Sequence, residues 1–369
     1  MKRILVTGAG GPAGVNFTLS LKLVGRREVY IVGAEANKYH IHMAKADKVY
    51  LTPKAEEKRY IDTINQIIAE EAVELVYPQP DIEVQVISEN REKISAKVFL
   101  PSKNTIRICQ DKLKTVEVLE KKGVPVPETI EVKGEDDLKK AFEELKKPVW
   151  IRATRGAGGK GSTPASSLEA ALAWIRYWKL RDEKLRFIAQ EYLPGRNLAF
   201  HALFRDGELI TSMARERVEY IYPSLSPSGI TGTPAVQRTI HSEKVNRIAE
   251  EAVLAIDSNY NGIASVDLKE DVEGIPRITE INPGRTFTTS FFFSYAGKLL
   301  YRKLSMPVSW FANIPYLYLK VAYGESLPPL KKYNILPANI YWIRHIDIPG
   351  KILIDGKIAG EMYRTWFDD

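Results

Sequence analysis

Residues 148–162 read PVWIRATRGAGGKGS, and this stretch says more about the fold than any other part of the chain. Its apolar beginning has the character of a strand and delivers Arg152 to a loop that contains four glycines. Glycine lets backbone N–H groups turn inward and approach an anion closely, and Arg155 and Lys160 add positive charge. The loop therefore predicts a phosphate site, although a mobile surface loop with solvated cations would have the same composition. It is not the P-loop, because the Gly-Lys-Ser/Thr ending is absent.

A second stretch, ITEINPGR at residues 278–285, ends a predicted strand with a carboxylate, an amide and a cation. Side chains alternate along a strand, so Glu280 and Asn282 share one face. Predicted strands at 262–269 and 276–282 form a hairpin that places Asp267 beside them. Carboxylate and amide oxygens suit a hard cation such as Mg²⁺. The glycine loop and this strand together predict Mg-nucleotide chemistry.

The composition is that of a globular protein with two or three domains. A chain of 369 residues is too long for one ordinary core, and contents of 44% hydrophobic and 27% charged residues are typical of a water-soluble fold. The formal net charge of +7 comes from 53 basic and 46 acidic residues, which are mixed along the helices. This distribution favours anionic small-molecule substrates, or serves solubility alone, so we expect no nucleic-acid partner.

The sequence also indicates in which cellular compartment the protein is expected. Cys109 is the single cysteine, which excludes an internal disulfide and suits the reducing cytoplasm. The apolar run at the N-terminus is too short for a signal peptide, and no uncharged run approaches the roughly 18 residues of a membrane span. We therefore expect a cytoplasmic protein without a membrane span.

Residues 1–104 alternate short apolar runs with amphipathic segments. This alternation predicts βαβ units and a parallel sheet. Strands are expected at 4–6, 29–32, 49–51, 75–77 and 98–100, and helices at about 13–24, 58–71 and 82–95.

The first predicted strand leads into a glycine motif. Gly8, Gly11 and Gly14 match a TGxxGxxG dinucleotide fingerprint, and Glu35 follows the second strand, where it could receive a ribose hydroxyl. The motif by itself predicts NAD(P) binding. The alternative is a tight strand-to-helix turn that binds no dinucleotide.

The middle of the chain is predicted to be mixed helix and strand. A helix is expected at 105–125, where Asp111 can cap it and Lys112 lies in its first turn. Further helices are expected at 135–146, 167–179 and 243–256. Residues 224–233 are rich in Ser, Gly and Pro, which predicts a mobile loop or lid.

The C-terminal third is rich in aromatic residues, with FFF at 291–293, WF at 310–311 and YLY at 316–318. We expect these side chains to be buried in the core or in a homodimer interface. Turn signals at 349–350 and 355–356 predict a small β appendix at the end.

These features together resemble the ATP-grasp family, in its carbamoyl-phosphate-synthetase-like branch. The resemblance covers about residues 1–300 and is strongest at 108–125, 148–162, 188–197 and 262–285. It implies an α/β and α+β multidomain fold, in which a Rossmann-like pre-grasp domain precedes a two-lobed ATP-grasp domain. The implied domains are the pre-grasp domain at 1–104, the N-lobe with the glycine-rich loop at 105–186, the C-lobe with the metal site at 187–315, and a C-terminal β appendix at 316–369.

The resemblance implies roles for single residues. Lys112 and Arg152 match cations that contact ATP phosphates. The implied ligands of Mg²⁺ (or Mn²⁺) are Asp267, Glu280 and Asn282. The implied catalytic residues are Arg285, Arg152 and Lys160, of which Arg285 would steady the transferred phosphoryl group. The glycine loop and a hinge that reads the adenine edge supply the other nucleotide contacts: Gly156, Ala157, Gly158, Gly159, Lys160, Gly161, Ser162, Gln190, Glu191, Tyr192, Leu193 and Asn197.

Two positions depart from the family pattern. Asn197 stands where the family usually has an acid for the ribose hydroxyls, which implies an altered nucleotide preference. Gly284 occupies the usual arginine position after Asn-Pro, so the cation moves to Arg285.

The substrate candidates come from two arguments. Arg215, Arg217 and Arg238 can bind a carboxylate bidentately, although each can equally be a solvated strand residue. Residues 228–233 look like the substrate-side loop of the family, which adds Ser228, Gly229 and Thr231.

The implied activity is that of an ATP- and Mg-dependent carbon–nitrogen ligase. It would phosphorylate a small-molecule carboxylate to an acylphosphate and join it to an amine, with release of ADP and phosphate. Two alternatives are an NAD(P)-dependent reductase that uses the N-terminal glycine motif and a non-catalytic nucleotide-binding sensor. His40 and His42 are predicted to be packing or surface residues rather than a zinc site.

Overall fold

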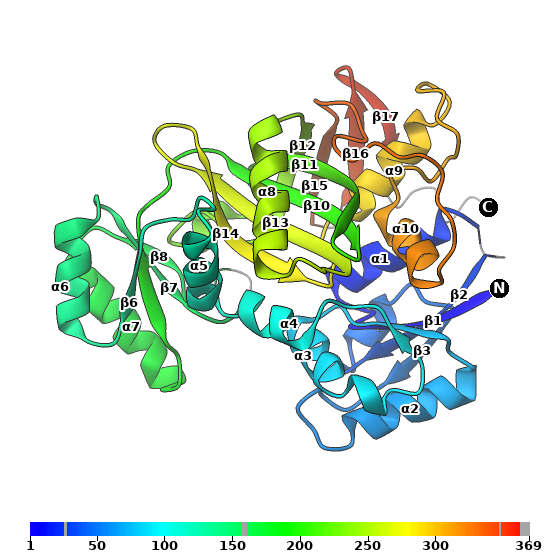
Figure 1. Ribbon diagram of the computed structural model, residues 1–369, viewed down its shortest axis with the longest axis horizontal. Helices are drawn as coiled ribbons and strands as arrows, with labels where there is room; N and C mark the ends of the chain where they lie inside the picture. The colour runs from blue at the N-terminus through cyan, green and yellow to red at the C-terminus, as the bar shows by residue number, and fades with distance from the viewer. Residues whose placement is uncertain (26–27, 157–158, 160, 347, 362–369) are drawn as a thin grey trace.

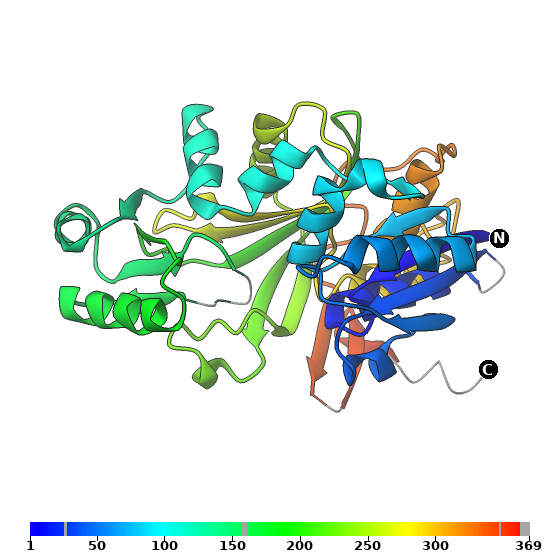
Figure 2. The ribbon, with the colours of Figure 1, turned by 90° about the horizontal axis from the view of Figure 1, so that it is seen from below.

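The chain forms three β-sheets in the computed structural model, which describes residues 1–25, 28–156, 159, 161–346 and 348–361 (Figure 1). A parallel sheet of five strands comes first, followed by an antiparallel sheet of four strands and an antiparallel sheet of eight. The four-stranded N-lobe lies at one end of the molecule, and the other two sheets pack together at the opposite end (Figures 1 and 2).

The pre-grasp sheet is parallel throughout and has the strand order β3-β2-β1-β4-β5, as the alternation of apolar runs and amphipathic segments predicted. Its third helix ends at Glu89, earlier than the expected residue 95, and a 3-10 turn at Arg91–Lys93 follows. The elements are β1 (Lys2–Thr7), α1 (Pro12–Lys22), β2 (Val29–Glu35), η1 (His40–Met43), β3 (Lys48–Leu51), α2 (Tyr60–Glu71), β4 (Leu75–Tyr77), α3 (Asp81–Glu89), η2 (Arg91–Lys93) and β5 (Lys97–Val98).

The segment that leads to the N-lobe contains two helices, so the expectation of one helix over 105–125 was wrong. Helix α4 (Lys103–Cys109) ends before Asp111, whose backbone is extended, and α5 (Lys112–Lys121) begins after it. The Asp111 side chain accepts a hydrogen bond from the Lys114 amide and so caps α5. The break turns α5 toward the glycine loop, because the Lys112 amide donates to the Thr154 carbonyl at 2.8 Å.

The N-lobe sheet has the order β6-β9-β7-β8 and its own hydrophobic core. Helices α6 and α7 pack against each other and against this sheet. The elements are β6 (Thr129–Val132), α6 (Glu135–Glu144), β7 (Val149–Ala153), β8 (Thr163–Ala165), α7 (Leu168–Arg181) and β9 (Phe187–Gln190).

The C-lobe sheet has the order β14-β13-β10-β11-β12-β15-β16-β17. The last three strands continue this sheet, since β15 pairs with β12. The elements are β10 (Asn197–Arg205), β11 (Glu208–Tyr220), η3 (Pro223–Leu225), β12 (Pro234–Ile240), α8 (Glu243–Ile256), β13 (Gly262–Glu270), β14 (Pro276–Pro283), α9 (Phe291–Leu300), α10 (Ile314–Ala322), β15 (Tyr341–His345), β16 (Ile348–Ile354) and β17 (Lys357–Glu361).

Alternation along the C-lobe strands divides the sheet into two faces. Along β10, Leu198, Phe200 and Ala202 join the core beneath α8, which lies across this face (Figure 1). Asn197, Ala199 and His201 point to the other face. That second face is turned toward the N-lobe at one end and toward α9 and α10 at the other.

Many aromatic side chains of the C-terminal third are buried in a core that they share with the N-terminal strands. Phe291, Phe292 and Phe293 of α9 are at most 1% exposed and share a core with the pre-grasp strands. Phe17 of α1 stacks on Tyr77 with ring centroids 3.8 Å apart, and Tyr318 of α10 meets both rings edge-on. Among the described helices, none combines the length and the apolar character needed to cross a bilayer.

Candidate active site

A cavity of about 530 Å³ lies between the N-lobe and the C-lobe sheet. Trp150 and Arg152 of β7 line it from the N-lobe, and five strands and two loops of the C-lobe line it from the other side. The view from below shows the two lobes facing each other across this region (Figure 2). Its position brings together most of the residues that the sequence singled out.

The register of the C-lobe strands arranges the cavity floor in three rows. Directly opposed residues of antiparallel strands point to the same face. The rows run across the sheet as Lys269-Asn197-Arg217-Gln237, Glu280-Asp267-Ala199-Arg215-Thr239 and Asn282-Ser265-His201-Met213. The candidate metal ligands therefore sit together at the β13–β14 end of the floor.

Each candidate metal ligand is held by a cation. Asp267 pairs with Arg217 at 2.5 Å, and Glu280 pairs with Arg152 at 3.4 Å and Lys112 at 3.5 Å. The Asn282 amide oxygen accepts a hydrogen bond from Arg285. Two carboxylates and an amide oxygen are a donor set that fits Mg²⁺. Within the described ranges, no three His, Cys, Asp or Glu side chains cluster closely enough to hold a metal without such an amide.

Burial and charge shift the pKa values of this group. Burial lowers the pKa of Lys112, and Glu280 only partly offsets that effect. Burial would raise the pKa of Glu280, but Lys112, Arg152 and Arg285 outweigh it and hold the pKa below its ordinary value. Glu280 is therefore a carboxylate at neutral pH.

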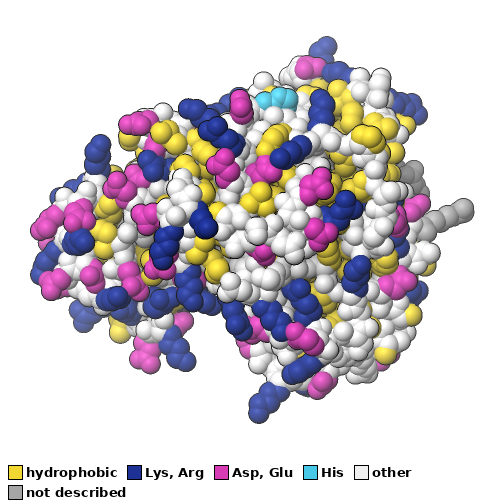
Figure 3. Space-filling view, in the orientation of Figure 1, with side chains coloured by type: hydrophobic (Ala, Val, Ile, Leu, Met, Phe, Trp, Pro, Cys, Tyr) yellow, Lys and Arg dark blue, Asp and Glu magenta, His cyan; other side chains and the backbone are white. Residues whose placement is uncertain are grey.

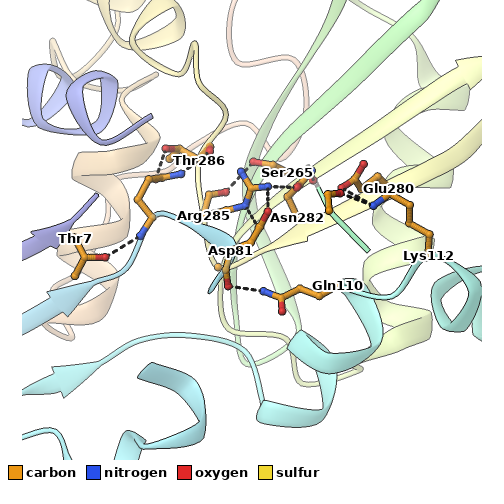
Figure 4. A network of polar contacts seen from close by, with 12 residues as sticks. Thr7, Asp81, Gln110, Lys112, Ser265, Glu280, Asn282, Arg285 and Thr286 are labelled. Carbon is orange, nitrogen blue, oxygen red and sulfur yellow. Dashed lines mark hydrogen bonds and ion pairs between the residues drawn. The ribbon is translucent and has the colours of Figure 1, made fainter. Parts of the chain in front are cut away.

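Arg285 connects the metal strand to the pre-grasp domain (Figure 4). Its Nη2 donates to the Asp81 carboxylate at 3.0 Å as well as to Asn282. Asp81 is the first residue of α3 and is fixed in turn by Gln110, whose amide donates to the Asp81 carbonyl at 2.8 Å. The carboxyl edge of the pre-grasp sheet thus contributes a wall of the site, as expected for an open parallel sheet.

The glycine loop lies over the cavity where the structure describes it. Gly159 and Ser162 line the cavity, and Gly156 accepts a hydrogen bond from Lys112 Nζ at 2.8 Å. Gly161 has a φ of +73°, and its carbonyl accepts a hydrogen bond from the Trp174 indole at 3.0 Å. The other predicted loop residues, Ala157, Gly158 and Lys160, lie outside the described residues.

The predicted hinge lies at the end of β9. The Gln190 side chain donates to Thr129 at 2.8 Å, and Glu191 pairs with Arg277 at 3.4 Å. Tyr192 lies under Lys269, with the ammonium 5.2 Å from the ring centroid. Leu193 is 6% exposed. Their role in binding adenine stays a prediction, while Asn197 does line the cavity.

The substrate candidates divide into two sets. Arg215, Arg217, Ser228 and Thr231 line the cavity, and Gly229 occupies a turn of the same loop with a φ of +70°. Arg238 does not join them. Its guanidinium pairs with Glu216 at 2.8 Å and bonds to Tyr341, so the structure uses it at the junction of β11, β12 and β15.

The space beside the N-terminal glycine motif is occupied by another segment of the same chain. A Cβ atom on Gly10 would lie 1.9 Å from the His40 carbonyl oxygen, so η1 covers this loop. Both Glu35 oxygens accept backbone hydrogen bonds at 2.9 Å, one from Gly10 and one from Asn37. Glu35 therefore anchors the loop in the place where a ribose contact was expected. His40 and His42 are exposed or partly exposed in η1.

Several cavity residues had no signal in the sequence patterns. Trp150, Leu268 and Lys269 line the end near the hinge, and Phe287 and Thr288 line the end near Arg215. Asp81 borders a neighbouring pocket together with Lys112 and Asn282, at the carboxyl edge of the parallel sheet, where ligands are expected.

Comparison with known protein families agrees with this architecture. Residues 109–290 match the model of the ATP-grasp domain, and residues 4–99 match the model of the PylC-like N-terminal domain. A carbamoyl-phosphate synthase from Methanobrevibacter smithii is 23% identical over 268 residues, which cover 69% of each chain. The large chain of carbamoyl phosphate synthase from Clostridium beijerinckii is 25% identical over 80% of this chain, but this chain spans 28% of that relative.

Solved structures share the fold. Carboxyaminoimidazole ribonucleotide synthase from Aspergillus clavatus, complexed with ATP, has a TM-score of 0.66 at 16% identity, covering 93% of this chain and 81% of the other. Biotin carboxylase from Campylobacter jejuni, in a β-γ-ATP complex, has a TM-score of 0.67 at 17% identity, covering 93% of this chain and 74% of the other. These structures confirm the predicted fold class, and the two family models confirm the family resemblance.

Proposed function

Because this chain is a member of the ATP-grasp family of ATP-dependent ligases, with a PylC-like N-terminal domain, we propose that it joins a carboxylate to an amine at the expense of ATP. The carboxylate would become an acylphosphate with release of ADP, and the amine would then displace phosphate to form an amide.

One observation carries the proposal. Cations of the N-lobe side, Lys112 and Arg152, meet Glu280 of the C-lobe at 3.5 and 3.4 Å inside the cavity. This arrangement supports a triphosphate site, because cations and metal-binding oxygens are the two groups that phosphoryl transfer requires. The bound Mg²⁺ would neutralise phosphate charge, and Asp267, Glu280 and Asn282 would hold it.

The chain's own residues would position the reactants. Arg152 and Lys112 would turn from Glu280 to the phosphates, and Arg285 would steady the transferred group from the pre-grasp side. A carboxylate oxygen of the substrate would attack the γ-phosphorus while the bond to the β-phosphate oxygen breaks. The amine nitrogen would then attack the acyl carbon, and the departing phosphate can accept the amine proton.

The surface charge agrees with small-molecule substrates. Lys and Arg side chains are spread over the visible face with Asp and Glu between them (Figure 3). On this face, such a mixture offers no continuous basic track of the kind that binds nucleic acid.

The first prediction tests the metal strand. In an assay of ADP and phosphate release with Mg-ATP and a panel of carboxylate and amine pairs, Glu280→Ala should lower turnover by about 100-fold or more, because it removes a charged ligand of the transition state. Glu273→Ala is the matched control, since Glu273 is exposed in the turn of the same hairpin. Equal turnover in the two variants would refute the metal assignment. Tight Mg-ATP binding without turnover on any pair would favour the nucleotide sensor.

A further inference from the structure

Arg215 is a buried cation in the cavity without an acidic partner. Its side chain lines the cavity, and the residue is 1% exposed. The other cavity arginines are paired: Arg152 with Glu280, Arg217 with Asp267, and Arg285 with Asp81. No carboxylate in the described part of the chain forms an ion pair with Arg215.

The contacts of Arg215 are neutral. Its Nη1 donates to the Gln237 amide oxygen and the Thr289 hydroxyl, and its guanidinium lies 4.4 Å from the Phe287 ring centroid. Its Nε has no hydrogen-bond partner among the described residues. A buried charge without a counter-ion costs several kcal/mol, so the site is complete only when an anion is bound.

The charged groups around Arg215 do not supply the missing counter-ion. The positive charges of Arg217 and Arg344 repel the charge of Arg215. Asp267 attracts it, but the Asp267 carboxylate is already paired with Arg217. Burial, with Arg217 as the next largest cause, lowers the pKa of Arg215 well below its ordinary value. The hollow around Arg215 is therefore positive, which favours an anionic ligand.

The Arg215 guanidinium is turned away from the metal strand, so it does not hold the reacting carboxylate. Arg217, on the same strand β11, reaches across β10 to Asp267. The Arg215 guanidinium is instead turned to Gln237 on β12, on the side away from β13. The reacting carboxylate must lie beside the γ-phosphate at Asp267 and Glu280.

We propose that the substrate carries a second carboxylate, which Arg215 binds through its Nε edge. This inference rests on the proposed ligase function, since it takes the reacting carboxylate to lie at the metal strand. The two carboxylates would lie at the two ends of the row Asp267-Ala199-Arg215, with the width of strand β10 between them. The substrate class is thus a dicarboxylate with a carbon spacer.

The surface of the C-lobe sheet between Asp267 and Arg215 leaves room for such a spacer. Ala199 lies between Asp267 and Arg215 in the same row, and its methyl group takes little space above β10. Thr231 and Thr288 line the cavity and offer hydroxyl groups for a polar substituent.

The test measures binding without turnover. Thermal unfolding and calorimetry of the full chain, with and without Mg-ADP, would compare glutarate and adipate with the monocarboxylates butyrate and valerate. The dicarboxylates should bind at least about tenfold more tightly, because a charge-assisted bidentate pair is gained. Arg215→Gln should abolish this preference. Arg238→Gln, which removes a paired arginine outside the cavity, should keep it.

A structural role for Arg215 predicts a different result. The ligand-free Arg215→Gln variant should be at least as stable as the wild type, because the substitution removes an unpaired buried charge. A large loss of ligand-free stability would overturn the proposal, as would equal binding of mono- and dicarboxylates by the wild type. Because no turnover is measured, dicarboxylate binding would be seen even if the ligase proposal failed.

Discussion

Glu83 shows how strongly position can change one ionisable residue. It lies in the first turn of α3, 6% exposed, and its Oε2 has no hydrogen-bond partner among the described residues. Burial raises its pKa to about 7, Thr7 opposes the shift, and Glu35 and Glu56 add to it. Glu280, by contrast, is surrounded by cations and keeps a lowered pKa.

Glu83 therefore predicts a pH dependence of stability. At pH values below the ordinary pKa of 4.5, Glu83 is protonated in both the folded and the unfolded chain, so it does not lower the free energy of unfolding. Between 4.5 and about 7 the unfolded chain loses the proton first, so stability falls as pH rises. Above pH 7, the buried Glu83 carboxylate lowers the free energy of unfolding by about 3 kcal/mol. The substitution Glu83→Gln should remove this loss.

Thermal unfolding at several pH values would check this prediction. The Tm of Glu83→Gln should exceed that of the wild type at pH 8, and the difference should shrink toward pH 5. Glu89→Gln, in the last turn of the same helix, is the control. A Tm difference that does not change with pH would show that Glu83 is not titrating in this range.

At the scale of elements, α7 holds one end of the glycine loop. The Trp174 indole N–H donates to the Gly161 carbonyl, where the backbone has a positive φ. The loop after β11 lies close to Gly159, since a Cβ on Gly159 would lie 3.5 Å from the Ile230 carbonyl oxygen. Gly161 is thus bonded to the N-lobe, and Gly159 faces the C-lobe.

Trp174→Phe should weaken Mg-ADP binding by about fivefold, because it removes one hydrogen bond worth about 1 kcal/mol from the loop. The unfolding temperature without ligand should change little. Titration calorimetry against Trp178→Phe, one turn further along α7, would check the effect. An equal loss in both variants would assign it to the packing of α7.

At the scale of the whole molecule, we expect two cooperative parts, because one hydrophobic core joins the pre-grasp and C-lobe sheets and another fills the N-lobe. The pre-grasp strands, the far end of the C-lobe sheet and helices α9 and α10 share one core. The side chain of Gln79 bonds twice to Thr286, through the carbonyl at 3.0 Å and the hydroxyl at 2.9 Å (Figure 4). The N-lobe keeps a core of its own.

Phe17→Ala should destabilise the shared part by about 3–5 kcal/mol, since Phe17 is 0% exposed and stacks on Tyr77. Hydrogen exchange should accelerate in β1 and also in β10 and β13, while β7 and β9 stay protected. Phe187→Ala, which empties a 0% exposed position in the N-lobe core, should give the reverse pattern. Faster exchange in all three sheets for both variants would indicate a single cooperative unit.

The sequence by itself determined most of the elements and singled out many of the residues that line the cavity between the lobes. Apolar runs, glycines and alternation are local, so they predicted the parallel sheet, the glycine loop and the shared face of Glu280 and Asn282. The break at Asp111 was missed because a capping residue inside a helical pattern has no periodic signal.

Only the tertiary structure decided which charges pair and which stay unpaired. Arg215 and Arg238 look alike as strand arginines, yet one is buried beside Phe287 and the other is paired with Glu216. Asp81 reaches Arg285 across 204 positions of sequence. The physical reason is that ion pairing depends on distance and burial across strands, and neither quantity is contained in a local pattern.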